Sequence, residues 1–340
     1  MWICTPMNKT NPKAIAWIFA KTAITAACLY FAIRKIDFPA FHDEFRHIKW
    51  PWLCLAMGQL LLIPFLGGRR WRIVLNSLGG AMRAGSSIRF FWIGMAFSQV
   101  LPSVSGGDAI RVILAWRDGV SLSLSAHSVI LERVAMMLTL ILLVVLIQYT
   151  AADHYSAPGS PLIYPLILLG AILAVGALLV ADRVIWILPD WRVCKAVALL
   201  SNDARRAFFA VSSYRLVILC FVTHINTAIG CLWLGNSLGL PLSLSDYVFY
   251  ISLVTLISTL PLSIGGWGIR EGAIVVLFGR LGIAAHVALA FSVLFGLSIA
   301  AISLVGVAGV WMSSQAWSFD CLRQTASQHA KADARKSAQC

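Results

Sequence analysis

The chain contains the stretch LPSVSGGDAIR at residues 101–111 and a second version of it, LPLSIGGWGIR, at residues 260–270. The two align without a gap, offset by the 159 residues from Pro102 to Pro261, and share Leu, Pro, both glycines, Ile and Arg. A shorter pair lies upstream of each copy, because Asn-Ser-Leu-Gly occurs at 76–79 and again at 236–239. The chain is therefore expected to consist of two related halves.

The composition is typical of an integral membrane protein. Apolar residues make up 59% of the chain and charged residues 12%, and several apolar stretches approach the roughly 20 residues that a helix needs to cross a bilayer. The net charge of +13 resides in short connections between these stretches, which indicates membrane topology rather than nucleic-acid binding. The eight cysteines form no C-x-x-C motif, and His127, His224 and His286 show no ligand spacing, so neither a metal nor a cofactor is expected.

The Lys and Arg counts distinguish two topologies for the repeated segments, 88–118 and 246–281. If the first arm of each segment crosses the membrane completely, the basic connection 182–213 falls outside, against the positive-inside rule. If each segment is a re-entrant hairpin, 182–213 and the Arg-rich 69–89 both lie in the cytoplasm, and we adopt this alternative. The outside then receives 151–160 and 236–245, which hold no Lys or Arg. Six full transmembrane helices are predicted at about 14–33, 52–68, 127–150, 161–181, 214–235 and 284–312.

The predicted fold is an all-α integral membrane protein with about six transmembrane helices and two oppositely oriented re-entrant hairpins. Such an inverted-topology repeat is found in many alternating-access transporters. A single polytopic domain fills residues 1–312 and a disordered cytoplasmic tail follows at 313–340, with both termini inside. For the connection 182–213, an amphipathic helix on the inner leaflet and a solvated loop that docks on the bundle remain alternatives. The domain divides into a first helix (14–33), repeat one (52–150), a linker helix with a cytoplasmic loop (161–213) and repeat two (214–312).

The Pro/Gly breaks of the two hairpins are the expected functional site. Breaks at Pro102 and Pro261 free backbone groups that lipid cannot satisfy, Gly permits close backbone approach, and Arg offers a bidentate fork. We expect the two halves to meet near mid-membrane and to bind a phosphate-bearing headgroup there. The residues proposed for this site are Arg111, Arg270, Gly106, Gly107, Gly265 and Gly266.

Further ionisable residues lie in apolar segments, where each costs at least about 2.5–3.5 kcal/mol near a helix centre. As charge partners or possible proton-coupling groups we expect Asp108, Glu132, Arg133 and Glu271. The alternative is that pairs such as Asp108–Arg111 and Glu132–Arg270 only neutralise each other and hold the hairpins in place. The run Arg69–Arg72 is expected to anchor the second helix at the cytoplasmic face.

Several of these motifs together resemble the lysylphosphatidylglycerol synthase transmembrane-region family, which is also called flippase-like. The most specific motif is P-x-S-x-G-G-x-G-x-R-E-G at 261–272, and it is joined by R-W-R at 70–72, the first repeat at 101–111 and L-E-R at 131–133. The resemblance covers about residues 14–312. It implies a multi-pass protein of a prokaryotic inner membrane that handles lipid. In the family's best-understood members this domain moves an aminoacylated phospholipid between leaflets, and a separate cytosolic domain synthesises that lipid.

The sequence itself carries no P-loop, H-E-x-x-H or G-x-S-x-G motif, and only a short tail follows Met312, so no enzyme activity is expected. We predict a flippase-like protein that translocates a phospho- or glycolipid between the leaflets of the bacterial inner membrane. The alternative is a non-transporting membrane subunit that presents lipid to a glycosyl- or aminoacyl-transferase partner. Membrane lipid is the expected substrate, and a lipid-modifying enzyme is a possible partner.

Overall fold

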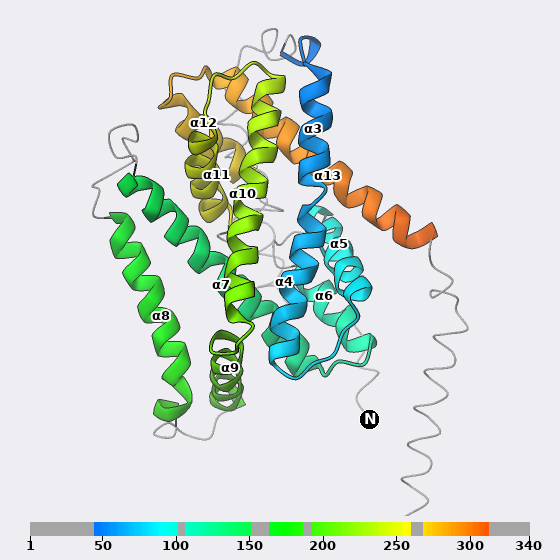
Figure 1. Ribbon diagram of the computed structural model, residues 1–340, viewed down its shortest axis with the longest axis vertical. Helices are drawn as coiled ribbons and strands as arrows, with labels where there is room; N and C mark the ends of the chain where they lie inside the picture. The colour runs from blue at the N-terminus through cyan, green and yellow to red at the C-terminus, as the bar shows by residue number, and fades with distance from the viewer. Residues whose placement is uncertain (1–43, 101–105, 151–162, 186–191, 260–267, 313–340) are drawn as a thin grey trace, which may run out of the picture.

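The computed structural model describes residues 44–100, 106–150, 163–185, 192–259 and 268–312. The predicted first helix, the two hairpin tips with Pro102, Pro261, Gly265 and Gly266, and the tail lie outside these residues. Within the described ranges all regular structure is helical, as predicted (Figure 1). The helices are α3 (Trp50–Leu60), α4 (Ile63–Ser77), α5 (Ala84–Val100), α6 (Gly106–Arg117), α7 (Leu122–Thr150), α8 (Ile163–Ile185), α9 (Arg192–Phe208), α10 (Ser213–Ser237), α11 (Leu244–Ser258), α12 (Ile269–Gly279) and α13 (Ala285–Met312).

Five segments of the described chain are long and apolar enough to cross a membrane, and each coincides with a predicted span. The first consists of α3 and α4 together, broken at Leu61–Leu62 just before Pro64, which has no N–H to continue the helical hydrogen bonds. The sixth predicted span, 14–33, lies outside the described residues. The five segments are Trp50–Ser77, Leu122–Tyr149, Pro165–Arg183, Ser213–Ser237 and Ala285–Gly306.

The two halves repeat the same order of helices. In each half a long helical segment, α3–α4 or α10, ends in the Asn-Ser-Leu-Gly turn, and two shorter helices follow. A long helix then closes each half, α7 with 29 residues in the first and α13 with 28 in the second. The turn needs a left-handed backbone at its glycine, with φ +86° at Gly79 and +73° at Gly239, a conformation that costs glycine little. The helix after the second turn starts with a capping box between Ser243 and Asp246.

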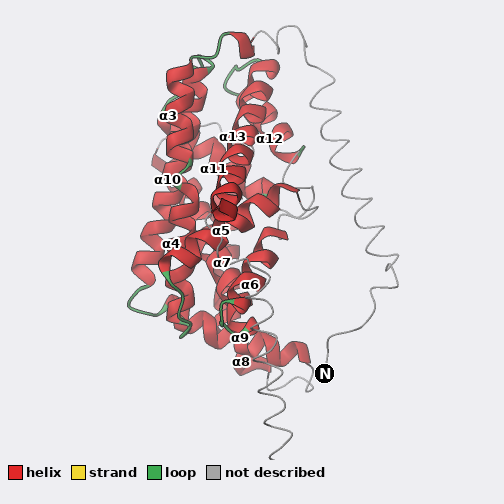
Figure 2. Ribbon diagram, turned by 90° about the vertical axis from the view of Figure 1, so that its right-hand side faces the viewer, coloured by secondary structure: helices red, strands yellow, loops and turns green. Residues whose placement is uncertain are grey.

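The long helices α3–α4 and α10, which open the two halves, run antiparallel. The backbone N–H of Lys49, at the start of α3, donates to the carbonyl of Ser237, at the end of α10 (2.9 Å). Further along the same pair of helices, Gln59 donates to Asn226 (2.8 Å). Figure 1 shows α3–α4 and α10 side by side along the length of the molecule, and Figure 2 shows them forming one side, with α12 and α13 beyond.

The shorter helices form two packed pairs inside this frame, α5 with α6 and α11 with α12. They contain 17, 12, 15 and 11 residues, fewer than the roughly 20 of a full span. At the crossing of α5 and α6 the backbones touch: a Cβ at Gly107 would overlap the carbonyl oxygen of Gly94 and the hydroxyl of Ser98. The second pair lies on an aromatic core in which the rings of Tyr247, Phe278 and Phe291 pack in tilted and edge-to-face contacts, with centroids 5.2–6.2 Å apart.

The connection between the halves contains a helix, α9, and not an irregular loop. One face of α9 is buried, with Ser201, Ala204 and Ala207 at 0–2% exposure, and the other carries exposed residues such as Arg206. Arg205 clamps α9 to α8 by donating twice to the Asp182 carboxylate (2.6 Å each). The helix of the first alternative for 182–213 is therefore observed over Arg192–Phe208, and it docks on the bundle as the second alternative expected; its contact with the inner leaflet stays a prediction.

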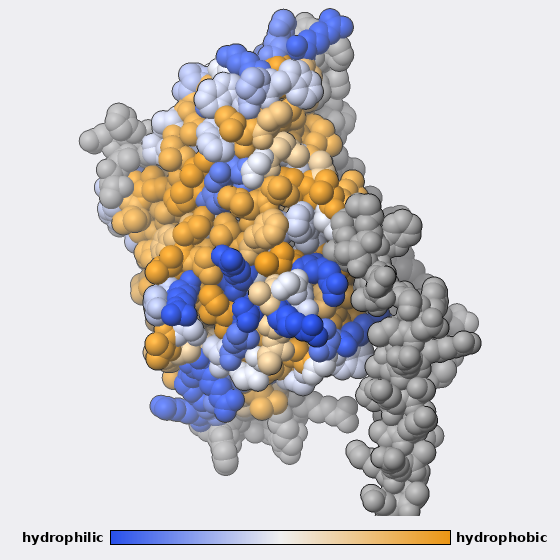
Figure 3. Space-filling view, turned by 45° about the vertical axis from the view of Figure 1, so that its right-hand side comes forward, coloured by the Kyte–Doolittle hydropathy of each residue, from blue (hydrophilic) through white to orange (hydrophobic). Residues whose placement is uncertain are grey.

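The surface of the molecule has an apolar middle and hydrophilic ends. Figure 3 shows apolar residues across the middle of the molecule and hydrophilic residues gathered toward its ends, most densely toward the end that holds α9 and the α4–α5 turn. Exposed basic residues of that end include Arg83, Arg117, Arg183 and Arg206. The α8 window that could cross a membrane has none of its residues buried, so this helix lies at the edge of the described bundle, with only one partly covered face against α7 and α9.

Candidate functional site

Five charged side chains form a continuous chain of ion pairs in the interior of the first half. We call Arg70, Asp108, Arg111, Glu132 and Arg133 the charged cluster. Their order in space alternates in sign: Arg70 to Glu132, Glu132 to Arg111, Arg111 to Asp108, and Asp108 to Arg133. Three arginines against two carboxylates leave one net positive charge, with a cation at each end.

Glu132, on α7, lies at the buried end of the cluster and is only 1% exposed. One carboxylate oxygen accepts from Arg70 Nε at 2.7 Å and the other lies 3.3 Å from Arg111. Arg70, 4% exposed on α4, also donates to the hydroxyl of Thr223 on α10 at 2.8 Å. This end of the cluster therefore joins helices of both halves.

Arg111 occupies the centre of the cluster. It donates to Asp108, three residues earlier on the same face of α6, at 2.5 Å, and it is 2% exposed. Its guanidinium lies over the rings of Phe91 and Trp71, with centroids 4.7 and 5.3 Å away, within the range of cation–π attraction. Two carboxylates and two aromatic rings thus fix this side chain.

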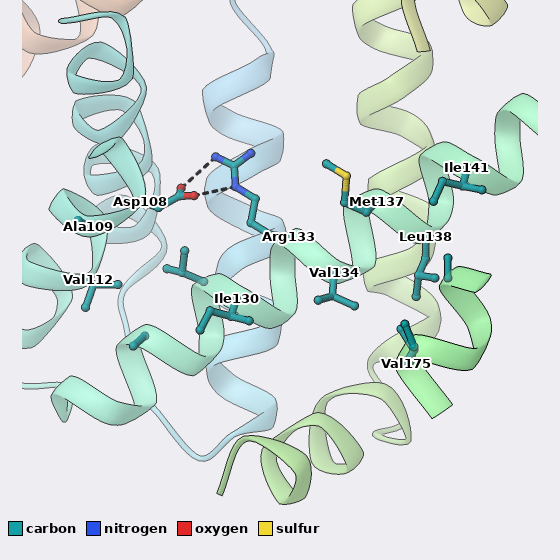
Figure 4. Close-up of a pocket in the computed structure, with 14 residues that line it drawn as sticks. Asp108, Ala109, Val112, Ile130, Arg133, Val134, Met137, Leu138, Ile141 and Val175 are labelled. Carbon is teal, nitrogen blue, oxygen red and sulfur yellow. Dashed lines mark hydrogen bonds and ion pairs between the residues drawn. The ribbon is translucent and has the colours of Figure 1, made fainter. Parts of the chain in front are cut away.

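Arg133 is the accessible end of the cluster. Its side chain is 42% exposed, against 17% for Asp108, and it grips that carboxylate with two parallel hydrogen bonds of 2.9 Å. Figure 4 shows Arg133 extending from α7 toward Asp108 on α6, with both hydrogen bonds drawn. Such a bidentate grip is the geometry with which arginine also binds phosphate.

The cluster lines a cavity of about 350 Å³ between the two halves, which we call the central cavity. Its walls come from α4, α5, α6 and α7 on one side and from α10, α11 and α13 on the other. Its volume falls within the range of about 300–1,000 Å³ that is typical of ligand pockets. Besides four members of the cluster (Arg70, Asp108, Arg111 and Arg133), polar groups at the cavity include Ser98, Gln99, Thr227, Ser252 and Thr255.

The second half has no matching row of charges among its described residues. Arg270 pairs with its neighbour Glu271 (2.6 Å), whose other oxygen accepts from the backbone N–H of Gly268 and caps α12. Glu132 is the eleventh residue of α7, and the eleventh residue of α13 is Phe295. Arg270 lies over the Phe295 ring at 5.7 Å, where Arg111 has Glu132. Within the described residues, the continuous row of ion pairs is therefore a feature of the first half.

The sequence matches the protein family described as the lysylphosphatidylglycerol synthase TM region over residues 18–306. This chain belongs to that family. No curated protein matches the chain in a sequence search. Membership and the five apolar segments together make it a multi-pass membrane protein.

The geometry of this member of the lysylphosphatidylglycerol synthase TM-region family departs in part from the sequence predictions. Asp108 and Arg111 pair as expected, but Glu132 pairs with Arg70 and Arg111, not with Arg270. Arg111 lines the central cavity, as does Phe295, whose ring lies under Arg270. Arg270 itself is not among the described residues that line this cavity. The possible proton-coupling roles of Asp108, Glu132, Arg133 and Glu271 stay predictions.

The two described glycines of the first break have a packing role in this structure. Gly106 begins α6, and Gly107 is buried against Gly94, as described above. The close backbone approach expected at Gly107 is thus made to a helix, α5. Their binding of a headgroup stays a prediction, as do the roles of Gly265 and Gly266, which lie outside the described residues.

Arg70 is the functional candidate that the sequence reasoning missed. It was expected to anchor a helix at the cytoplasmic face, but it is buried in an ion pair. The helical period carries the signal that was overlooked. Gly67, Trp71, Val74 and Leu78 recur at three- and four-residue steps and are all buried. Arg70 lies three residues after Gly67 and four before Val74, so it projects on this same side of α4. Arg69, at the preceding position, is exposed.

Proposed function

We propose that this protein moves an anionic lipid, with a phosphate in its headgroup, between the leaflets of a bacterial inner membrane. The observation that carries the proposal is the charged cluster. It leaves one net positive charge in the interior of a membrane protein, at a cavity walled by both halves. Ionisable groups at such depth are costly and mark substrate pathways, and an anionic headgroup balances this charge.

The arrangement of the helices supports an inverted-topology repeat. The halves share their helix order and the long helices α3–α4 and α10 run antiparallel, as the halves of many alternating-access transporters do. Because α5–α6 and α11–α12 are pairs of short helices, we interpret them as re-entrant hairpins that enter from opposite sides. The exposed Arg83, Arg117, Arg183 and Arg206 support a cytoplasmic position for the α9 end.

In this mechanism the headgroup crosses through the central cavity while the acyl chains stay in the bilayer. The cluster compensates the desolvated phosphate, which otherwise meets the full cost of burying a charge. The step moves a lipid without making or breaking a covalent bond, so it needs no chemical group beyond those that bind and orient the headgroup. No ATP-binding motif is found in the sequence, which is consistent with facilitated or gradient-driven movement.

The experiment is lipid flipping in proteoliposomes that contain acyl-labelled phosphatidic acid, phosphatidylglycerol or phosphatidylcholine. Dithionite bleaches label in the outer leaflet, so lipid moved from the inner leaflet appears as an additional bleaching phase. We expect the additional phase with the wild type. With Arg111→Gln we expect it to be at least about tenfold slower, because hydrogen bonds to charged groups contribute about 1.5–3 kcal/mol. The exposed Arg206→Gln serves as the matched control.

Three outcomes separate the possible functions. Flipping that requires Arg111 supports translocation through the charged cluster. Flipping that Arg111→Gln leaves intact, in a variant with wild-type thermal stability, contradicts this pathway. Binding of lipid without any flipping contradicts translocation and favours a subunit that presents lipid to a transferase partner.

A further inference from the structure

A second hollow adjoins the charged cluster on the outer side of the bundle. It measures about 600 Å³ and lies along α7 between α6 and α8 (Figure 4); we call it the lateral crevice. Twelve of its fourteen lining residues are apolar, and the other two are Asp108 and Arg133. These two residues also line the central cavity, so the Asp108–Arg133 pair stands between the two hollows.

We propose that the lateral crevice is the site where the lipid loads, with an acyl chain along α7 and its phosphate on Arg133 in place of Asp108. The inference rests on the proposed function and adds to it the place and the first step of substrate binding. It concerns a diacyl phospholipid, because one end of the site is a cation and the rest is apolar.

The charge balance of the cluster permits this exchange at either end, at Arg133 or at Arg70. When Arg133 leaves Asp108, the carboxylate keeps Arg111 at 2.5 Å. The remaining members, Arg70, Glu132, Arg111 and Asp108, then form a neutral chain of two cations and two anions. A phosphate bound to Arg133 then neutralises the one surplus positive charge of the cluster.

The other two arginines are held too firmly for such an exchange. Arg111 is 2% exposed and is fixed by two carboxylates and two rings. Arg70 is 4% exposed and binds both Glu132 and Thr223. Arg133, at 42% exposure, is the member of the cluster that a ligand can reach without first opening the helix packing.

The walls of the crevice suit an acyl chain. Both α6 and α8 pack on α7, and the crevice runs along α7 between them past Val112, Ile130, Leu138 and Val175. Because α7 and α8 are both apolar segments long enough to cross the membrane, the open side of the crevice faces hydrocarbon. A chain that enters from the bilayer therefore loses little solvation, and the phosphate is the part of the lipid that needs a partner.

The test is equilibrium binding of two lipids to the purified full chain, read by native mass spectrometry. Phosphatidic acid and diacylglycerol with identical chains differ only in the phosphate. We expect phosphatidic acid to bind the wild type at least about tenfold more tightly, and Arg133→Gln to remove this preference. Arg133→Lys should restore part of it. Asp108→Asn should increase the affinity for phosphatidic acid several-fold, since the competing carboxylate is gone.

Arg133→Gln should lower the affinity for phosphatidic acid and Asp108→Asn should raise it, and these opposite effects distinguish ligand exchange from a purely structural ion pair. If the pair were only structural, either substitution would weaken binding. A second pair of variants tests the crevice. Ala174 lines the lateral crevice. Ala174→Trp fills the space for the acyl chain and should therefore weaken binding of both lipids at least about tenfold. Leu173→Trp, on the exposed side of α8, should bind as the wild type does.

Equal behaviour of Ala174→Trp and Leu173→Trp overturns the inference, as does a decrease in affinity with both Arg133→Gln and Asp108→Asn. Flipping is measured on the same preparations, so the two proposals can fail separately. A wild type that flips lipid while these substitutions leave its binding unchanged refutes the lateral crevice and leaves the proposed function standing. A wild type that neither binds nor flips any lipid in the panel refutes both.

Discussion

Replacing Glu132 with Gln should expose how strongly the charged cluster couples the two halves. The substitution keeps the size of the side chain but removes the carboxylate that is 2.5 Å from Arg70 and 3.3 Å from Arg111. Arg111 keeps Asp108, whereas Arg70 keeps only the Thr223 hydroxyl among its partners described above. The variant therefore contains a buried cation without a counter-charge.

The magnitude follows from the burial of the pair, at 1% and 4% exposure. Removing one partner of a buried ion pair typically costs about 3–5 kcal/mol, because the other charge remains desolvated. We expect Glu132→Gln to lower the free energy of unfolding by about that amount. Removing both charges of the pair leaves no unpaired buried charge. Arg70→Met combined with Glu132→Gln should therefore recover at least about 2 kcal/mol of the lost stability.

The assay is unfolding in mixed micelles by titration with dodecyl sulfate, followed by far-ultraviolet circular dichroism. Asp118→Asn is the matched control, since this carboxylate is exposed in the turn between α6 and α7, and should change stability by less than about 0.5 kcal/mol. A loss below about 1 kcal/mol for Glu132→Gln, or a double variant whose loss equals the sum of the two single losses, would refute the reasoning.

Two further predictions concern packing. Gly107→Ala should destabilise by about 1–3 kcal/mol in the same titration, because its methyl group meets the backbone of α5; Gly85→Ala, which has open space, should be neutral or stabilising, and equal effects would contradict this packing. Arg205→Gln removes both hydrogen bonds to Asp182 and should speed amide hydrogen exchange in α9 relative to α10; unchanged exchange would show that the clamp does not hold α9.

Much of the fold is predictable from the sequence because the membrane imposes length and hydropathy on every span. Five predicted spans coincide with apolar segments of the structure, and the repeated segments 88–118 and 246–281 coincide with pairs of short helices. The order of the helices and the positions of the Asn-Ser-Leu-Gly turns are also predictable, since Gly79 and Gly239 mark equivalent helix ends. The break between α3 and α4 was not predicted, although Pro64 indicates it.

The candidate site was harder to predict, because it depends on which helices are neighbours. The pairing of Asp108 with Arg111 is local, three residues along one helix face, and sequence spacing suffices for it. The partner of Glu132 is set by the packing of α4 on α7, about which the sequence distance of 62 residues says nothing. The repeat suggested that Arg270 mirrors Arg111, but Phe295 occupies the place that Glu132 has in the first half.

The central claim is that the charged cluster carries a lipid phosphate across the membrane, and the flipping rate of Arg133→Gln tests it most directly. The measurement compares dithionite bleaching of acyl-labelled phosphatidic acid in vesicles with equal amounts of wild type, Arg133→Gln and the exposed control Arg206→Gln. The account predicts at least about tenfold slower flipping for Arg133→Gln and wild-type rates for the control. Equal rates for all three proteins would contradict the claim.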